Sequence, residues 1–155
     1  MPRQPPFDRL VESPDVLIEQ PRWSIIKRRS DGRIDFVSPV PCPYNYGCIP
    51  AVASGDGDAL DAVVLGPRLP RGQRLRVPVV AVIGFIDAGR FDPKVVCSAS
   101  AIGRGERVEL LVFFFWYAWF KRVLSTVRRQ PADTRSLGFL PDSVWRNADS
   151  ASATS

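Results

Sequence analysis

Three aspartates lie within six residues of one another, at Asp56, Asp58 and Asp61. Two carboxylates about 5 Å apart repel each other by roughly 3 kcal/mol at an effective dielectric constant near 20, so such a cluster is unfavourable unless a cation offsets it. Gly55 and Gly57 permit the backbone conformations that a chelating loop needs. Because the ligand atoms are all oxygen, the pattern favours Mg²⁺, with Mn²⁺ as a substitute. The alternative is an exposed acidic turn, since Asp and Gly are common turn residues.

A second acidic pair follows at Asp87 and Asp92, and Lys94 comes two residues later. If the loops that carry these residues open at the same end of a sheet, five aspartates converge. Cations at Lys27 and Arg33 accompany them. Carboxylate-held metal ions beside lysine and arginine suit phosphoryl chemistry, because metal ions and cations bridge phosphate oxygens while a carboxylate handles the water.

The absence of histidine among the 155 residues removes whole mechanisms. It excludes a Ser-His-Asp or Cys-His triad, a histidine-ligated zinc and an imidazole general base. With 21 lysines and arginines against 16 aspartates and glutamates, the net charge of +5 predicts an anionic partner. Any catalysis therefore depends on carboxylates, lysine, arginine, tyrosine and a metal held by oxygen.

The three cysteines, Cys42, Cys48 and Cys97, form neither a disulfide framework nor a four-cysteine zinc site. We expect reduced thiols in a cytoplasmic protein, because the N-terminus also offers no apolar signal-peptide core. The most apolar stretch, residues 108–120, contains Glu109 and is too short, at about 13 residues, to span a bilayer. We therefore expect no membrane partner.

Short runs rich in valine and isoleucine, separated by proline and glycine, predict the strands of a small antiparallel or barrel-like sheet. The longest run is expected to be the central strand, with Pro78 near its start, where a missing hydrogen-bond donor is tolerable. The predicted strands cover residues 16–18, 24–27, 34–37, 62–65, 75–86 and 94–99.

One long helix is predicted over residues 106–129, because no glycine or proline interrupts this stretch and apolar residues recur at helical spacing. The second face of the helix is apolar too, with Val112, Phe115, Trp116, Trp119 and Val123. A helix that is apolar all round leaves a face in water only for a reason, so we expect a homo-oligomer that uses this face. The alternative is a helix wholly buried in its own domain.

The two ends of the chain have the composition of loose segments. Residues 1–13 are predicted to form a loose N-terminal arm and residues 143–155 a polar C-terminal tail. Residues 14–142 then form a single domain. A chain of this size buries roughly 70% of the surface that it exposes when unfolded, which is enough for one core.

In order and spacing, these motifs resemble those of the soluble family I inorganic pyrophosphatases, of which the chain would be a divergent member. The resemblance implies an α+β, mainly β fold: a five-stranded OB-like β-barrel with a long packed C-terminal helix. It also implies Mg²⁺-dependent hydrolysis of inorganic pyrophosphate to two phosphates. The motifs that carry it are at residues 16–21, 27, 43–47, 55–61, 87–94 and 113–117.

The resemblance also implies roles for single residues. Asp58 would be the catalytic base that accepts a proton from the metal-activated water. The metal ligands would be Asp56, Asp61, Asp87, Asp92 and Glu19. The phosphate ligands would be Lys27, Arg33, Tyr46, Lys94, Tyr117 and Lys121.

Two of the phosphate ligands are assigned where the chain departs from the family. The family's arginine aligns near Arg33 or Ile34, and Arg33 is preferred for its chemistry. Ala118 stands where the family has a lysine after Tyr117. Lys121 can replace that lysine, because it lies one helical turn further along the same face.

Two other functions compete with pyrophosphate hydrolysis. At Arg29, Cys42 and Ala118 the chain differs from the family pattern. These differences favour a related metal-dependent phosphohydrolase with a shifted substrate. The net positive charge and the OB-like barrel are compatible with a non-catalytic barrel that binds nucleic acid. The five aspartates argue against nucleic acid, because a binder of polyanions has no reason to concentrate acidic side chains.

Overall fold

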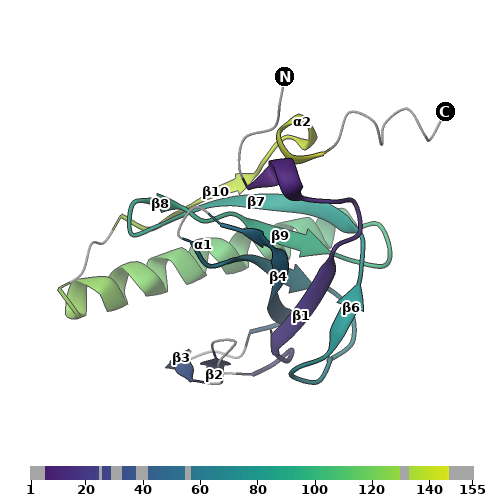
Figure 1. Ribbon diagram of the computed structural model, residues 1–155. Helices are drawn as coiled ribbons and strands as arrows, with labels where there is room; N and C mark the ends of the chain where they lie inside the picture. Colours follow the sequence, from purple (N-terminus) through teal and green to yellow (C-terminus); the bar gives the residue numbers. More distant parts are fainter. Residues whose placement is uncertain are drawn as a thin grey trace.

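The predicted sheet is present and has more strands than expected. The computed structural model describes residues 6–24, 26–28, 33–37, 42–54, 57–129 and 133–146. Within them, one eight-stranded sheet contains β1 (Asp15–Gln20), β4 (Asn45–Ala53), β5 (Ala59–Val64), β6 (Arg74–Arg76), β7 (Val79–Asp87), β8 (Arg90–Phe91), β9 (Lys94–Cys97) and β10 (Arg135–Phe139). A separate two-stranded sheet consists of β2 (Ile26–Arg28) and β3 (Ile34–Val37) (Figure 1).

The sheet is an open path rather than a closed barrel of five strands. Its strands follow the order β10-β7-β9-β5-β4-β1-β6, and β8 pairs with β7. The pair β5–β9 is parallel and the other described pairs are antiparallel. The mainly β class with one long packed helix, α1 (Arg104–Val127), is confirmed, whereas the strand number and the closure differ from the expectation.

The stretch predicted as one central strand, residues 75–86, is divided between β6 and β7. The division falls at Pro78, which has no N–H to donate to a ladder. β6 pairs with β1, and β7 pairs with β9 and β10. Proline therefore marks a change of partner strand and not merely a tolerated gap near a strand start.

The sequence patterns did not predict β4, which lies between β5 and β1. The strand contains Gly47 and Pro50, two residues that usually weaken a strand. Gly47 is required by close packing, because a Cβ there would lie 1.9 Å from the backbone oxygen of Leu17. Pro50 is exposed and lies where the pairing register of β4 with β5 shifts. Tertiary context thus overrides local propensity at both positions.

Apolar side chains cover both faces of the sheet. On one face, residues such as Val63, Ile83 and Phe85 pack with Leu110 and Phe114 of α1. The other face carries a second cluster. Figure 1 shows α1 lying along one side of the sheet and α2 (Asp142–Trp145) on the other. The second cluster includes Val16, Ile18, Leu60, Ala62, Val82 and Val95.

Both end segments contribute to this second cluster, contrary to the prediction of a loose arm and a polar tail. Phe7, the first residue of the short 3₁₀ helix η1 (Phe7–Arg9), and Leu10, which follows it, are 1% and 3% exposed. Trp145 in α2 is 4% exposed. The described parts of both ends are ordered because these large apolar side chains complete the core. Residues 1–5 and 147–155 lie outside the described residues.

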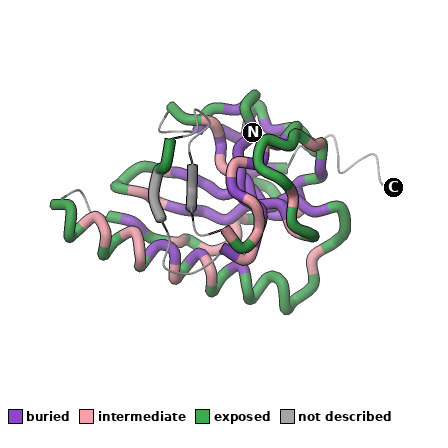
Figure 2. Tube along the Cα trace, turned by 90° about the horizontal axis from the view of Figure 1, so that it is seen from below, coloured by how far each residue is buried: buried purple, intermediate pink, exposed green. Residues whose placement is uncertain are grey.

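The long helix begins and ends two residues earlier than predicted and has the two faces that were expected. Its buried residues are Leu110, Phe114, Tyr117 and Ala118. Phe115, on the opposite face, is 73% exposed. Buried, intermediate and exposed segments alternate along α1 in Figure 2, so the alternative of a wholly buried helix is wrong. The other large apolar residues exposed along it are Val108, Leu111, Val112, Trp119, Val123 and Val127.

By length and composition, α1 could also cross a membrane, and it is the single helix of that kind in the described part of the chain. This differs from the estimate made for residues 108–120, because the helix continues at both ends to 24 residues. In the structure, α1 packs its buried face against the sheet.

Candidate active site

A lysine between two aspartates forms the centre of the candidate site. Asp61 in β5 and Lys94 at the start of β9 are direct partners in the parallel register. The Nζ atom of Lys94 lies 2.6 Å from Oδ2 of Asp61 and 2.7 Å from Oδ2 of Asp92. The Lys94 side chain is 1% exposed. A buried ammonium is stable only when it is paired in this way.

The electrostatics of Lys94 follow from this pairing. Burial alone lowers the pKa of an ammonium, but the neighbouring Asp61 and Asp92 carboxylates raise the pKa of Lys94 well above its ordinary value. The Nζ atom also lies 5.1 Å from the centre of the Phe85 ring, within the range of a cation–π contact. Lys94 therefore carries a permanent positive charge at neutral pH.

Two tyrosines border this charged pair. The hydroxyl of Tyr46, in β4, donates a hydrogen bond of 3.2 Å to Oδ2 of Asp61. Burial and the charge of Asp61 raise the pKa of Tyr46 well above its ordinary value, so its hydroxyl stays protonated. Tyr117, from α1, packs its ring 5.8 Å from that of Phe85 and interacts electrostatically with Lys94. The Tyr46 hydroxyl thus shares the Asp61 carboxylate with the lysine, and Tyr117 is near enough to interact with the lysine's charge.

A second ion pair joins the end of β7 to α1. The Nζ atom of Lys121 lies 2.5 Å from Oδ2 of Asp87. Thr134 donates a hydrogen bond of 3.3 Å to Oδ1 of the same carboxylate. Burial raises the pKa of Asp87, but Lys121, Lys94 and Thr134 outweigh it and hold this pKa below its ordinary value. Lys121, one turn after Ala118, therefore reaches the acidic residue that ends β7.

Glu19 lies in β1 and meets the site through Cys48. The Cys48 thiol donates a hydrogen bond to Glu19, and burial together with this carboxylate raises the pKa of Cys48 to about 12. Cys48 is the cross-strand partner of Asp61, so the two side chains share one face of the sheet. The Glu19 carboxylate is thereby directed toward the face that carries Asp61.

The remaining predicted residues are less fully placed. Asp58 is exposed in the turn before β5. Asp56 lies outside the described residues. Lys27 belongs to β2, and Arg33 is exposed just before β3, so both come from the separate two-stranded sheet. The backbone of the large sheet and α1 therefore gather Tyr46, Asp61, Asp92, Lys94 and Tyr117, with Asp87 and Lys121 as an adjoining pair.

The donor set fits a hard cation in part. Among the described residues, no three acidic, cysteine or histidine side chains converge as a metal cluster. The Asp61 and Asp92 carboxylates do converge on one positive charge, the Lys94 ammonium. The space between the two carboxylates therefore favours a cation. Carboxylate oxygens are the ligands that Mg²⁺ prefers. Asp61 and Asp92 would hold it, with Asp56 as the third predicted ligand.

The sequence patterns missed two polar residues of the site. Ser54 donates a hydrogen bond of 3.3 Å from its Oγ to Oδ1 of Asp92. Thr134 is 1% exposed and bonds both Asp87 and the backbone N–H of Ala88. Ser54 precedes the acidic loop and could have been suspected from that position. Thr134 lies 47 residues from Asp87, and nothing in the pattern links the two.

Comparison with known proteins shows to which family the chain belongs. The sequence model of the family described as inorganic pyrophosphatase matches residues 16–109. The inorganic pyrophosphatase of Haemophilus influenzae is 41% identical over 56 residues, which cover 36% of this chain and 32% of that protein. The inorganic pyrophosphatase of Synechocystis is 34% identical over 92 residues, covering 54% of each chain. The matched stretches thus span between a third and about half of these relatives.

Two solved structures have the same fold over most of their length. The inorganic pyrophosphatase of Thermus thermophilus is 27% identical, with a TM-score of 0.68, over 89% of this chain and 87% of that one. The enzyme of Coxiella burnetii is 21% identical, with a TM-score of 0.70, over 86% and 89% of the two chains, and it shows the fold alone. With a family match over more than half of its residues, the chain belongs to the inorganic pyrophosphatase family.

Proposed function

We propose that this protein hydrolyses inorganic pyrophosphate to two phosphates, with Mg²⁺ as its cofactor and Mn²⁺ as a substitute. The observation that carries the proposal is the buried Lys94 held between Asp61 and Asp92. A lysine beside two carboxylates offers both halves of a phosphoryl-transfer site, because it supplies a cation for phosphate oxygens and leaves two acidic oxygens for a metal. Bound Mg²⁺ would supply an acidified water and would offset phosphate charge.

The residues of the chain have separate tasks in this proposal. Lys94 and Lys121 neutralise the charge of phosphate oxygens. When the substrate binds, each lysine releases a carboxylate partner and pairs with a phosphate oxygen instead. Tyr46 and Tyr117 donate hydrogen bonds to the phosphates, and the raised pKa of Tyr46 keeps its hydroxyl protonated. Asp58, which is exposed to water, accepts the proton of the attacking water. These groups stabilise charge where it develops during the reaction.

Five further predicted ligands complete the proposed site. Asp87 and Glu19 would take part in metal binding at its outer side. Lys27 and Arg33, from the β2–β3 hairpin, would bind phosphate from a separate element. Asp56 would join Asp61 and Asp92 as a metal ligand. Support for these assignments comes from the family motif and from the position of each residue in the sequence.

Release of phosphate tests this function. The purified chain is given pyrophosphate with Mg²⁺, with Mn²⁺ or with EDTA, and a simple phosphate monoester serves as the alternative substrate. We expect fast release from pyrophosphate alone, abolished by EDTA. Asp92→Asn should lose this activity, whereas Asp142→Asn, in an exposed ion pair with Arg146, should keep it. Release from the monoester instead would favour the phosphohydrolase with a shifted substrate, and no release from either would refute the proposal.

We further propose that the protein is a cytoplasmic homo-oligomer built on one domain, which comprises residues 14–142 and the core residues Phe7, Leu10 and Trp145 that pack onto them, and that copies meet through the exposed face of α1. The breadth of that apolar face, with Phe115 at 73% and Val112 at 63% exposure, supports the contact. The three buried free cysteines are consistent with a reducing compartment. Light scattering should show that Phe115→Glu dissociates the oligomer while Val11→Glu, at another exposed apolar residue, leaves it intact.

A further inference from the structure

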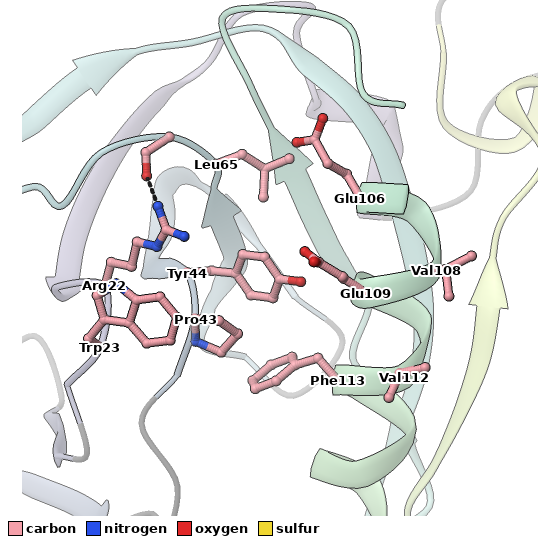
Figure 3. Close-up of a pocket in the computed structure, with 11 residues that line it drawn as sticks. Arg22, Trp23, Pro43, Tyr44, Leu65, Glu106, Val108, Glu109, Val112 and Phe113 are labelled. Atoms are coloured by element: carbon pink, nitrogen blue, oxygen red, sulfur yellow. Dashed lines mark hydrogen bonds between the residues drawn. The ribbon is translucent and has the colours of Figure 1, made fainter. Parts of the chain in front are cut away.

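The two ends of α1 meet different parts of the molecule. Figure 3 shows a pocket of about 650 Å³ beside the first turns, between α1 and the segments that carry Arg22 and Tyr44, and no residue of the candidate active site lines it. Toward the last turns, Lys121 and Arg122 contact the end of β7 and the segment before β10. The polar network of the candidate site therefore continues at the C-terminal end of the helix.

Thr134, the residue before β10, joins the end of β7 to α1. Its hydroxyl donates a hydrogen bond of 3.3 Å to Oδ1 of Asp87 and accepts one of 3.2 Å from the backbone N–H of Ala88. Its backbone oxygen accepts two hydrogen bonds from the guanidinium of Arg122, of 3.1 Å from Nε and 2.8 Å from Nη2. Because Thr134 is 1% exposed, water does not replace these partners.

The turn that follows Asp87 depends on the same segment. Ala88 has a φ of 51° and Gly89 a φ of 80°, so both adopt the left-handed conformation of a two-residue hairpin turn between β7 and β8. This conformation is unfavourable for alanine, which has a Cβ. The N–H of Gly89 donates a hydrogen bond of 2.8 Å to the backbone oxygen of Asp133. Residues 133 and 134 therefore hold the turn in place, and with it the backbone of Asp87.

The carboxylate of Asp87 has two partners of different kinds. Its Oδ2 lies 2.5 Å from the Nζ atom of Lys121, and its Oδ1 accepts the hydrogen bond of Thr134. In the proposed function, a phosphate oxygen draws Lys121 away from Asp87. The partly buried carboxylate then loses its nearest positive charge, which is unfavourable unless another donor remains. The Thr134 hydroxyl is such a donor, and it carries no charge that a phosphate would attract.

We propose that Thr134 is a positioning residue for the exchange of partners at Lys121. It holds the Asp87 carboxylate by one hydrogen bond and the following turn by another, so that Lys121 can leave Asp87 for a phosphate. Arg122 ties Thr134 to the helical turn that carries Lys121, so both partners of Asp87 belong to one connected unit. The inference rests on the proposed function, in which Lys121 pairs with phosphate.

The test separates the hydroxyl of Thr134 from its methyl group. Thr134→Val keeps nearly the same shape and removes the hydroxyl, whereas Thr134→Ser keeps the hydroxyl and leaves a small cavity. We expect Thr134→Val to raise the KM for pyrophosphate about tenfold, the lower end of the effect of one hydrogen bond to a charged group. Thr134→Ser should keep the KM and lower the melting temperature. The matched control is Thr126→Val, which removes an exposed hydroxyl bonded to the backbone oxygen of Arg122 and should leave the KM unchanged.

Binding without turnover provides a second readout. Isothermal titration calorimetry with inorganic phosphate and Mg²⁺ should show weaker binding to Thr134→Val, also by about tenfold, and unchanged binding to Thr134→Ser. Circular dichroism checks that both variants are folded.

The possible outcomes distinguish this inference from the proposed function. If the wild type is active and Thr134→Val has the same KM and phosphate affinity, the inference is wrong and the proposed function stands. A lower kcat at unchanged KM also overturns the inference, because a purely structural loss only reduces the amount of folded enzyme. A wild type that hydrolyses no pyrophosphate refutes the proposed function. The phosphate affinities of the two variants then decide whether Thr134 supports anion binding at Lys121.

Discussion

Asp61 and Lys94, 33 residues apart in the sequence, are neighbours in the parallel register of β5 and β9, and their charged atoms meet at 2.6 Å. The backbone pairing places the two side chains on the same face of the sheet, so the ion pair follows directly from the strand order. Because Lys94 is buried, its positive charge depends on the neighbouring carboxylate. The same contact links the stability of the fold to the chemistry of the site.

Removing the buried lysine should destabilise the protein. Lys94→Met leaves Asp61 and Asp92 facing each other without a counter-charge, and breaking a buried ion pair in this way costs about 3–5 kcal/mol. Urea unfolding should show that loss in the absence of metal. Added Mg²⁺ should raise the melting temperature of the variant more than that of the wild type, because the metal would replace the lost charge. An unchanged free energy of unfolding would contradict this view of the pair.

Asp58, just before β5, and Asp61, within it, should respond differently to substitution. Asp58 is exposed, so Asp58→Asn should lower kcat by about 100-fold or more, as expected for a lost general base, with no change in stability. Asp61→Asn should lower activity, metal affinity and the free energy of unfolding together, because Asp61 holds Lys94 and Tyr46. Steady-state kinetics and metal titration check this. Equal, mild losses in the two variants would refute the assigned roles.

Acid stability should depend on the Lys121–Asp87 pair. The folded pKa of Asp87 lies below its unfolded value, so its contribution to stability is complete above the unfolded pKa, near 4, and is lost as the pH falls through the folded pKa. Lys121→Met removes the main charge that lowers this pKa. The wild type should therefore be more stable than the variant at pH 6, and the difference should shrink toward pH 2. Unfolding curves across this range measure it, and a constant difference would contradict the linkage.

The cysteines should be unreactive in the folded protein. All three are buried, and burial together with Glu19 raises the pKa of Cys48 to about 12, which leaves almost no thiolate at pH 8. A chromogenic disulfide reagent should titrate the thiols rapidly only after denaturation. Rapid reaction of Cys48 in the native state would contradict the prediction, because it would mean that the thiol is accessible to solvent and not buried beside Glu19.

Glycine should be indispensable at one position and replaceable at another. Gly47→Ala places a Cβ 1.9 Å from the Leu17 oxygen, so we expect destabilisation beyond about 3 kcal/mol. Gly105→Ala, in the first turn of α1, meets open space and should stabilise the protein by about 0.5–1 kcal/mol. Chemical denaturation of the two variants gives opposite signs if the packing of β4 against β1 is as described.

Much of the site could be predicted because its residues lie in short motifs. Asp61, Asp87, Asp92 and Lys94 were all found from their types and spacing, and the structure brings Asp61, Asp92 and Lys94 together. Lys121 was assigned because the family resemblance implies a lysine after Tyr117, and a residue one helical turn beyond Ala118 can point along the same face. The prediction of α1 itself succeeded because an uninterrupted helical pattern is a local signal.

The failures have a common physical cause. β4 was missed because Gly47 and Pro50 weaken the local pattern, and only the close approach of Leu17 explains the glycine. Residues 7–10 and Trp145 were taken as parts of loose ends, although the core needs their apolar side chains. These features depend on partners that are distant in sequence, which no local pattern contains.

The sequence by itself determined the chemistry of this protein: oxygen ligands and cations without histidine, at spacings typical of one family, together with a long helix whose two faces are both apolar. The tertiary structure decided which charges meet. It placed Lys94 between Asp61 and Asp92 and Lys121 on Asp87, and it brought Thr134 to the same carboxylate as Lys121. Residue types and spacing are local properties of the chain, whereas the pairing of charges depends on strand order and burial, which arise only when distant segments pack together.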